Sequence, residues 1–273
     1  MVKLPSMSYW QNKVVLVTGG SSGLGRVIVE AFAAAGAKVA IAGLEPEAVD
    51  ETERSLAATG CEALGIAVDI TQQDQVDGLF DQVVRRFGGL DVLVNNAGRS
   101  MRGTVADTAP EQFRELMELN LIALVRCTRA ALPHLMARRG HVVNIGSLAS
   151  KSASRWVGAY PATKHAVAAY SQQLRLELGP QGLHVLLVCP GPIARKGSRL
   201  YHLEGLEDVP ERARHPGAGV RARAISPEAL AKAILRACKR RQPELVVPGY
   251  FRLLFALGHL SPRLGDWLVL RMT

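Results

Sequence analysis

Short apolar runs alternate with longer segments of helical periodicity along most of the chain. The apolar runs are continuous rather than alternating with polar residues, which is typical of strands covered on both faces of a sheet. They lie at 13–19, 38–43, 62–70, 90–98, 141–147, 183–191 and 244–248. Helical patterns fall between them, at 24–35, 46–59, 71–87, 110–139, 158–178 and 227–241.

This alternation predicts an α/β fold with a doubly wound parallel sheet. Strands that alternate with helices are joined by right-handed crossovers and pair in parallel. We therefore expect one Rossmann-like domain over residues 1–273, with six to seven strands and helices on both faces. Two segments stand outside the rhythm: a long loop at 192–226, which we expect to cover a substrate, and a tail at 249–273.

The net charge of the chain bears on which classes of partner it could bind. It has 273 residues, a formal net charge of +9 and 21% charged residues. A basic surplus suits nucleic acid, an anionic membrane surface or an anionic cofactor. No zinc finger or RNA-binding strand motif accompanies the basic residues, so we do not expect nucleic acid as a partner.

The cysteines and the absence of long apolar segments bear on the compartment. The four cysteines form no CxxC pair, which argues against a disulfide framework and a metal site and fits a reducing environment. The first residues lack the apolar core of a signal peptide, and no run of about 18 uncharged apolar residues could span a membrane. We therefore expect a cytoplasmic protein.

A glycine-rich turn, TGGSSGLG at 18–25, follows the first predicted strand and opens a helix. Gly19, Gly23 and Gly25 would let the backbone turn tightly and approach a ligand closely. Free N–H groups at the start of the helix favour a pyrophosphate there. A purely structural turn is the alternative, and the flanking strand and helix favour the phosphate site.

The stretch YPATK at 160–164 places Tyr160 and Lys164 on one side of a helix. The pair could be an exposed pair on a solvated helix, or a proton donor and the cation that tunes it. A free tyrosine has a pKa of about 10, too high for ready proton exchange at neutral pH. A fixed ammonium nearby favours the phenolate and would make the phenol a usable acid or base.

Six motifs occur along the chain in one order, and together they resemble the classical short-chain dehydrogenase/reductase family. They are TGxxxGxG at 18–25, NNAG at 95–98, Asn120, Ser147, YxxxK at Tyr160 and Lys164, and PG at 190–191. The resemblance runs from about Asn12 to Val247. It implies a Rossmann fold and NAD(P)-dependent redox chemistry.

The resemblance also implies roles for individual residues. Tyr160 would be the general acid or base, Ser147 would polarise the substrate oxygen, and Lys164 would hold the nicotinamide ribose and tune Tyr160. Asn120 would anchor a water that links Lys164 to solvent. The implied cofactor site comprises Thr18, Gly19, Ser21, Ser22, Gly23, Leu24, Gly25, Leu44, Asp69, Ile70, Asn96, Ala97, Gly98, Tyr160, Lys164, Pro190, Gly191 and Ile193, with no metal.

The end of the second predicted strand bears on the choice of dinucleotide. An acidic residue there binds the ribose 2′-OH of NAD, and a basic residue binds the 2′-phosphate of NADP. The family's acidic position falls near Gly43 and its basic position near Leu44, and Ser22 stands where NADP enzymes often carry a basic residue. Both expected residues are absent, and Glu45 comes slightly late for the acidic role, although it could reach the ribose. The absence of an acid at 43 and the net positive charge of the chain favour NADP(H) slightly over NAD(H). Arg195 replaces the threonine that often binds the nicotinamide carboxamide.

These observations predict an oxidoreductase that interconverts a carbonyl and a secondary alcohol. The alternatives are a dinucleotide-binding sensor or scaffold without turnover, and an epimerase-type reaction on the same fold. An intact set of Ser147, Tyr160 and Lys164 favours the oxidoreductase, since a sensor needs no proton donor.

The tail at 249–273 has apolar stripes punctuated by arginine. One interpretation is a subunit contact in a homo-oligomer, such as a dimer or tetramer, and this comes first. A second is an amphipathic helix on a membrane surface, and a third is a cover over a lipophilic pocket. The stripes are Phe251, Leu254, Phe255 and Gly258, and beyond Pro262 they are Leu264, Trp267 and Leu268.

Overall fold

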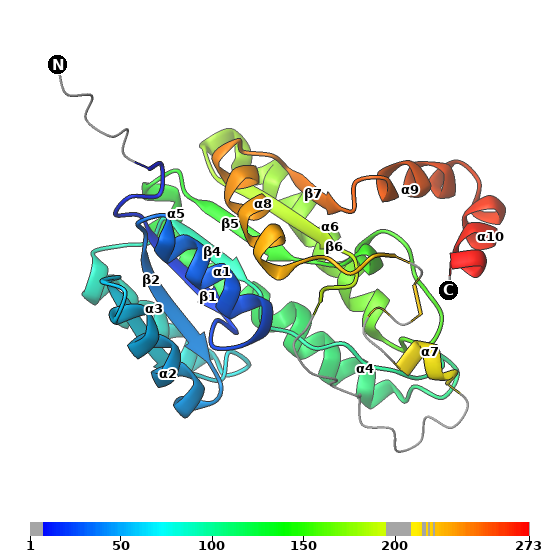
Figure 1. Cartoon of the computed structure of the whole chain (residues 1–273), viewed down its shortest axis with the longest axis horizontal. Coiled ribbons are helices and arrows are strands. Elements are labelled where there is room, and N and C mark those ends of the chain that lie inside the picture. Colours follow the sequence, from blue (N-terminus) through cyan, green and yellow to red (C-terminus); the bar gives the residue numbers. More distant parts are fainter. Residues whose placement is uncertain (1–7, 195–208, 215–216, 218, 221, 273) are drawn as a thin grey trace.

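The computed structural model contains one seven-stranded parallel sheet with helices packed on both faces (Figure 1). It describes residues 8–194, 209–214, 217, 219, 220 and 222–272. The strand order is β3-β2-β1-β4-β5-β6-β7, so the predicted doubly wound fold is confirmed. The strands are β1 Val14–Thr18, β2 Lys38–Gly43, β3 Ala63–Ala67, β4 Val92–Asn95, β5 His141–Ile145, β6 His184–Pro190 and β7 Glu244–Val247.

Two apolar layers hold the helices against the sheet. On one face, Phe32 and Ile234 belong to one buried apolar cluster, which joins the sheet to the layer of α1 Gly23–Ala34, α2 Pro46–Ala57 and α8 Pro227–Lys239. On the other face, Leu79 and Leu135 belong to the layer of α3 Gln73–Phe87, α5 Ala123–Ala137 and α6 Tyr160–Leu178. Burial on both faces explains why the strands read as continuous apolar runs.

The segment predicted as one or two long helices at 110–139 is interrupted. Helix α4, Pro110–Met117, runs into a π-helical turn, η1 Glu118–Ile122, before α5 begins. Such turns are often found at functional sites, and this one carries Asn120. Strands β3 and β4 are also shorter than predicted, because residues 68–70 and 96–98 leave the sheet to line a cavity at its carboxyl edge.

A chain of buried hydrogen bonds closes the opposite edge of the sheet. The Nδ1 atoms of His141 and His184 lie 2.8 Å apart. His184 Nε2 donates to the carbonyl of Gln242 at 2.8 Å, so Nδ1 of the neutral His184 ring is an acceptor. His141 Nδ1 therefore donates to it, and His141 Nε2 accepts from the Tyr9 hydroxyl at 3.0 Å. Cys238 Sγ lies within 4.8 Å of these imidazoles, whose ring nitrogens are all engaged already. Burial lowers the pKa of both histidines below 6.5.

The tail folds into a hairpin of two short helices beyond β7, orange-red to red in Figure 1. Helix α9, Phe251–Leu260, ends at the extended residue Ser261, and α10, Pro262–Met272, begins with the proline. Gly258 and Gly265 let the two helices approach closely, since a Cβ on Gly265 would lie 2.9 Å from the Gly258 Cα. Within the described residues, the helices are too short or too polar to cross a membrane.

Candidate active site

A large cavity of about 2290 Å³ lies along the carboxyl edge of the sheet. In doubly wound folds, ligands bind at this edge, where the strand order reverses. Here the reversal falls between β1 and β4. Pockets for small ligands are typically about 300–1,000 Å³, so the cavity has room for a dinucleotide and a second molecule.

The glycine turn forms one end of the cavity and has the geometry that a pyrophosphate needs. Gly19 and Gly23 have φ angles of 62° and 52°, which favour glycine. A Cβ on Gly25 would lie 2.0 Å from the Gly19 carbonyl oxygen, so only glycine fits there. Ser22 precedes α1 in an extended conformation without a side-chain capping bond, and the N–H groups of the first helical turn therefore face an open site.

Thr18 and Gly25 shape this turn and are absent from the cavity lining. Thr18 Oγ1 accepts hydrogen bonds from the backbone N–H groups of Asn96 and Ala97, both at 3.1 Å. It thereby joins the end of β1 to the end of β4. Thr18 acts on the site through the positions of these neighbours.

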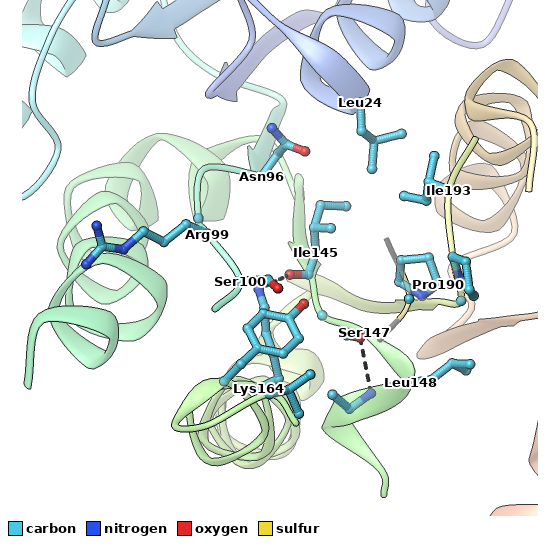
Figure 2. Close-up of a pocket in the computed structure, with 18 of the residues that line it drawn as sticks. Leu24, Asn96, Arg99, Ser100, Ile145, Ser147, Leu148, Lys164, Pro190 and Ile193 are labelled. Carbon is cyan, nitrogen blue, oxygen red and sulfur yellow. Dashed lines mark hydrogen bonds between the residues drawn. The ribbon is translucent and has the colours of Figure 1, made fainter. Parts of the chain in front are cut away.

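Tyr160, Lys164 and Ser147 converge on the other end of the cavity. Tyr160 is the first residue of α6, Lys164 follows one turn later, and Ser147 comes two residues after the last residue of β5. All three line the cavity. The Lys164 ammonium donates to the Ile145 carbonyl at 2.9 Å and lies 5.8 Å from the centre of the Tyr160 ring. Figure 2 shows Lys164 and Ser147 at one end, with Leu24 and Asn96 toward the other.

Lys164 is a buried cation whose ammonium donates to a backbone carbonyl. Only 6% of its surface is exposed, and burial lowers its pKa from 10.5 to about 8. A desolvated ammonium interacts more strongly with a nearby anion than one in water does. The site is therefore suited to stabilise a phenolate on the neighbouring tyrosine.

Ser147 has a structural role and retains a proton to donate. Its Oγ accepts a hydrogen bond from the Ala149 N–H at 3.1 Å and caps the short helix η2, Leu148–Ser150. A hydroxyl that accepts one bond can still donate its own proton. Ser147 can therefore donate to a ligand oxygen in the cavity while it holds the turn.

Asn120 is buried behind the cavity and connects two elements of the site. Its Oδ1 accepts from the Arg99 N–H, and its Nδ2 donates to the Arg99 carbonyl, both at 2.9 Å. Nδ2 also donates to Thr163 Oγ1 at 3.0 Å. The side chain thus fixes the loop after β4 against α6, three residues along the chain from Tyr160. The water expected at Asn120 stays a prediction.

The remaining residues predicted at the cofactor site line the cavity in the structure. Asp69 also holds the turn after β3, because its Oδ1 accepts from the Thr71 N–H at 2.9 Å and from its hydroxyl at 2.7 Å. Arg195 falls outside the described residues. The lining residues are Gly19, Ser21, Ser22, Gly23, Leu24, Leu44, Asp69, Ile70, Asn96, Ala97, Gly98, Pro190, Gly191 and Ile193.

Sequence reasoning missed Arg102, a buried arginine that lines the cavity. Its Nε donates to the Ala213 carbonyl at 2.7 Å, and its Nη1 donates to Ser100 Oγ at 2.8 Å. Ala213 belongs to α7, Glu211–Arg214, in the loop predicted to cover the substrate. Arg102 therefore fixes the described part of this loop to the wall of the cavity, and no local sequence pattern indicates such a contact.

A buried polar network beneath the site was also missed. Asn95 Nδ2 donates to Thr128 Oγ1 at 3.0 Å and to Asn144 Oδ1 at 2.9 Å, and Asn144 Nδ2 donates to Ser171 Oγ at 2.9 Å. The network joins β4 and β5 to α5 and α6. Asn95 and Asn144 are polar residues within otherwise apolar strands. They could have indicated the network, because buried amides need hydrogen-bond partners.

Comparisons with known proteins agree with this geometry. The family model for short chain dehydrogenases matches residues 13–199. Dehydrogenase/reductase SDR family member 7B from Bos taurus is 37% identical over 193 residues, which cover 68% of this chain and 59% of the relative. The matching part thus spans about three fifths of that relative's length. Ketoacyl reductase HetN from Nostoc sp. is 31% identical over 95% of this chain and 89% of its own.

Solved structures show the same fold. A short-chain dehydrogenase from Streptomyces avermitilis superposes with a TM-score of 0.78 at 34% identity, covering 95% of this chain and 97% of that one. A short-chain dehydrogenase/reductase from Burkholderia phymatum, solved in complex with NAD, gives a TM-score of 0.80 at 23% identity, over 93% and 95% of the two chains. The family match over most of the chain confirms what the six motifs predicted: this protein belongs to the short-chain dehydrogenase/reductase family.

Proposed function

We propose that this protein is an NAD(P)(H)-dependent oxidoreductase that interconverts a carbonyl and a secondary alcohol. The observation that carries the proposal is the meeting of Tyr160, Ser147 and the buried ammonium of Lys164 in one cavity. The glycine turn at the far end of the same cavity suits the pyrophosphate of a dinucleotide.

The chain's own residues orient the substrate and move the proton. Ser147 donates a hydrogen bond to the substrate oxygen and stabilises the negative charge that develops on it. Tyr160 donates its hydroxyl proton to that oxygen during reduction and takes a proton back during oxidation. Lys164 stabilises the phenolate that remains on Tyr160. A bound nicotinamide dinucleotide supplies the hydride for reduction and accepts it in oxidation.

The end of β2 supports NADP(H) as the preferred dinucleotide. Gly43 leaves no room for an acidic side chain, since even a Cβ there would lie 2.6 Å from Ser21 Oγ. Leu44 is 65% exposed beside the cavity and offers no acceptor to a ribose hydroxyl. Glu45 also lines the cavity, and it is the residue that would favour NAD(H) instead.

Arg26 provides a positive charge close to this end of the cavity. It lies one helical turn after Ser22 and lines the cavity. Its guanidinium contacts Glu51 at 2.9 Å and Glu30 at 3.2 Å. We infer that a 2′-phosphate is held by Ser22 and Arg26, with the phosphate competing for the guanidinium against the two exposed carboxylates.

The side chains around the catalytic end support a lipophilic substrate. Leu148, Val157, Phe251, Leu254 and Phe255 line the cavity together with the catalytic residues. Apolar walls of this kind bind substrates by removing apolar surface from water. A ketone or alcohol with a large apolar body fits them better than a sugar does.

A panel of ketones with increasing apolar size tests the proposal, with the disappearance of reduced cofactor as the readout. We expect turnover with NADPH, and kcat/KM that rises with the apolar size of the ketone. Cofactor binding without turnover of any ketone or secondary alcohol would instead indicate a dinucleotide sensor. A cytoplasmic location and a homo-oligomeric state stay predictions, and the size of the protein in solution tests the latter.

A further inference from the structure

The α9–α10 hairpin has two apolar faces, and only one of them packs against other residues that the structure describes. The inner face lies on the cavity and on the last two strands. Phe251 is buried, and it packs with Val246 and Cys189 in a small apolar cluster. Leu254, Phe255, Leu268 and Met272 also line the cavity. The inner face therefore has its partners within the chain.

The outer face is exposed and consists of large apolar side chains. Leu253 and Leu260, seven residues apart on α9, are 66% and 84% exposed. Leu264, Trp267 and Leu270 on α10 are 39%, 49% and 54% exposed. Large apolar side chains gathered on an exposed part of a protein surface often mark an interaction site. We call these five residues the outer face.

The charges around the outer face are mainly positive. Arg252, Arg263 and Arg271 are exposed on the hairpin, and Asp266 is its one acidic residue. The Arg271 guanidinium stacks over the Trp267 ring at 4.4 Å. A stacked arginine and tryptophan combine an apolar surface with a cation at the same place. The whole chain is also positively charged, with a formal net charge of +9.

We propose that the outer face of the hairpin docks on an anionic lipid surface. Helices that lie in a membrane interface combine tryptophan and leucine on one side with arginine or lysine at the polar boundary. The outer face has this composition, and its arginines are complementary to acidic headgroups. The protein would bind peripherally, with α9 and α10 lying along the membrane surface.

A second copy of the chain fits this face less well. A two-fold contact would bring the same patch of each copy together, and three arginines would then face three arginines with only Asp266 to offset them. The hairpin is also small. Two helices about 15 Å long and about 10 Å apart present roughly 300 Å², against about 800 Å² per partner in a stable interface. These two points favour the membrane interpretation of the tail over the subunit contact that the sequence placed first, and a homo-oligomeric state stays a prediction.

The placement of the hairpin connects a membrane to the cavity. Its inner face lines the space beside Tyr160 and Ser147, while its outer face would touch the lipid. A lipophilic substrate could then pass from the bilayer into the cavity past the same two helices. This consequence depends on the proposed function, but binding to lipid does not.

Vesicle flotation of the full-length protein tests the proposal without any activity measurement. Vesicles of phosphatidylcholine alone are compared with vesicles that also contain phosphatidylglycerol, at low and at moderate salt. We expect flotation with the anionic vesicles, weakened by salt, and a blue shift of the Trp267 emission that is absent from Trp267→Phe. No flotation with anionic vesicles would overturn the proposal.

Two sets of variants separate the apolar contribution from the charge. Leu253→Ser with Leu260→Ser should lower partitioning at least tenfold, because two exposed leucines lose their burial in lipid. Arg263→Gln with Arg271→Gln should lower it roughly fivefold for each charge removed. Leu176→Ser is the matched control, since Leu176 is 66% exposed on α6 and should leave binding unchanged.

Three outcomes count against the membrane. Flotation that depends on the arginines and not on the leucines would indicate charge attraction without docking of the outer face. A dimer that dissociates in the double-serine variant, with no vesicle binding by the wild type, would assign the outer face to a subunit contact. Equal loss of binding in Leu176→Ser would show that the hairpin has no special role.

Discussion

Replacing Lys164 by methionine should stabilise the folded protein while it removes activity. Burial lowers the pKa of Lys164 from 10.5 to about 8. Each pKa unit is worth about 1.4 kcal/mol, so holding the ammonium in the folded state costs about 3 kcal/mol below about pH 8. Methionine has a similar length and carries no charge, so it removes this cost.

Part of the gain is offset by the lost hydrogen bond. The Ile145 carbonyl accepts from the Lys164 ammonium at 2.9 Å and would lose this donor, at about 1 kcal/mol. The net gain in the free energy of unfolding is therefore about 2 kcal/mol at neutral pH. The gain should depend on pH with a definite sign. Between about pH 8 and pH 10.5, the unfolded chain holds the lysine proton and the folded chain does not, so the wild type gains stability as pH rises.

Urea denaturation of the apoprotein at a series of pH values measures this difference. The advantage of Lys164→Met should shrink by about 1.4 kcal/mol per pH unit above about pH 8 and vanish near about pH 10. Comparing the two proteins at each pH cancels the titration of the buried cysteines. Lys232→Met, which removes an exposed lysine on α8, is the matched control. A variant that is less stable than the wild type at neutral pH, or a gain that does not change with pH, would refute the reasoning.

Three further predictions concern other parts of the structure. His141 and His184 are held neutral in the folded state and gain protons on unfolding, so the protein loses stability as the pH falls below about 6.5. His184→Gln should reduce this loss by about 1.4 kcal/mol per pH unit. Measuring the free energy of unfolding over an acid pH series checks it, with His165→Gln, at an exposed position, as the control. Arg102→Leu should raise KM about fivefold with little change in kcat, since it releases one hydrogen bond to the covering loop; steady-state kinetics separate the two constants. Arg26→Gln should weaken NADPH binding about tenfold and leave NADH binding nearly unchanged, as cofactor fluorescence titrations would show, and equal effects on both would remove Arg26 from the phosphate site.

The regular elements could be predicted because their signals are local. The apolar run at 38–43 has the same first and last residues as β2. Gly36 and Gly60 end the helical patterns before β2 and β3. The chemistry at Tyr160 and Lys164 was predictable for the same reason, since helical spacing fixes which side chains share a side.

Features that depend on tertiary contacts could not be predicted. The π-helical turn at Asn120 has no local signal, because its side chain is held by Arg99 and Thr163 from distant segments. In the tail, the sequence pattern places Leu268 and Trp267 on one apolar stripe. In the structure they lie on different faces of the hairpin, because Leu268 lines the cavity and Trp267 is exposed. Which face of a short helix is buried depends on the surface it meets.

In the proposed mechanism the Tyr160 hydroxyl transfers the proton, and one substitution tests this role. Tyr160→Phe removes the hydroxyl and keeps the ring, and Tyr170→Phe on the same helix is its matched control. We expect Tyr160→Phe to bind NADPH about as well as the wild type, while its kcat falls by about 10²–10⁴-fold. Turnover at the wild-type rate in Tyr160→Phe would show that this hydroxyl does not transfer the proton.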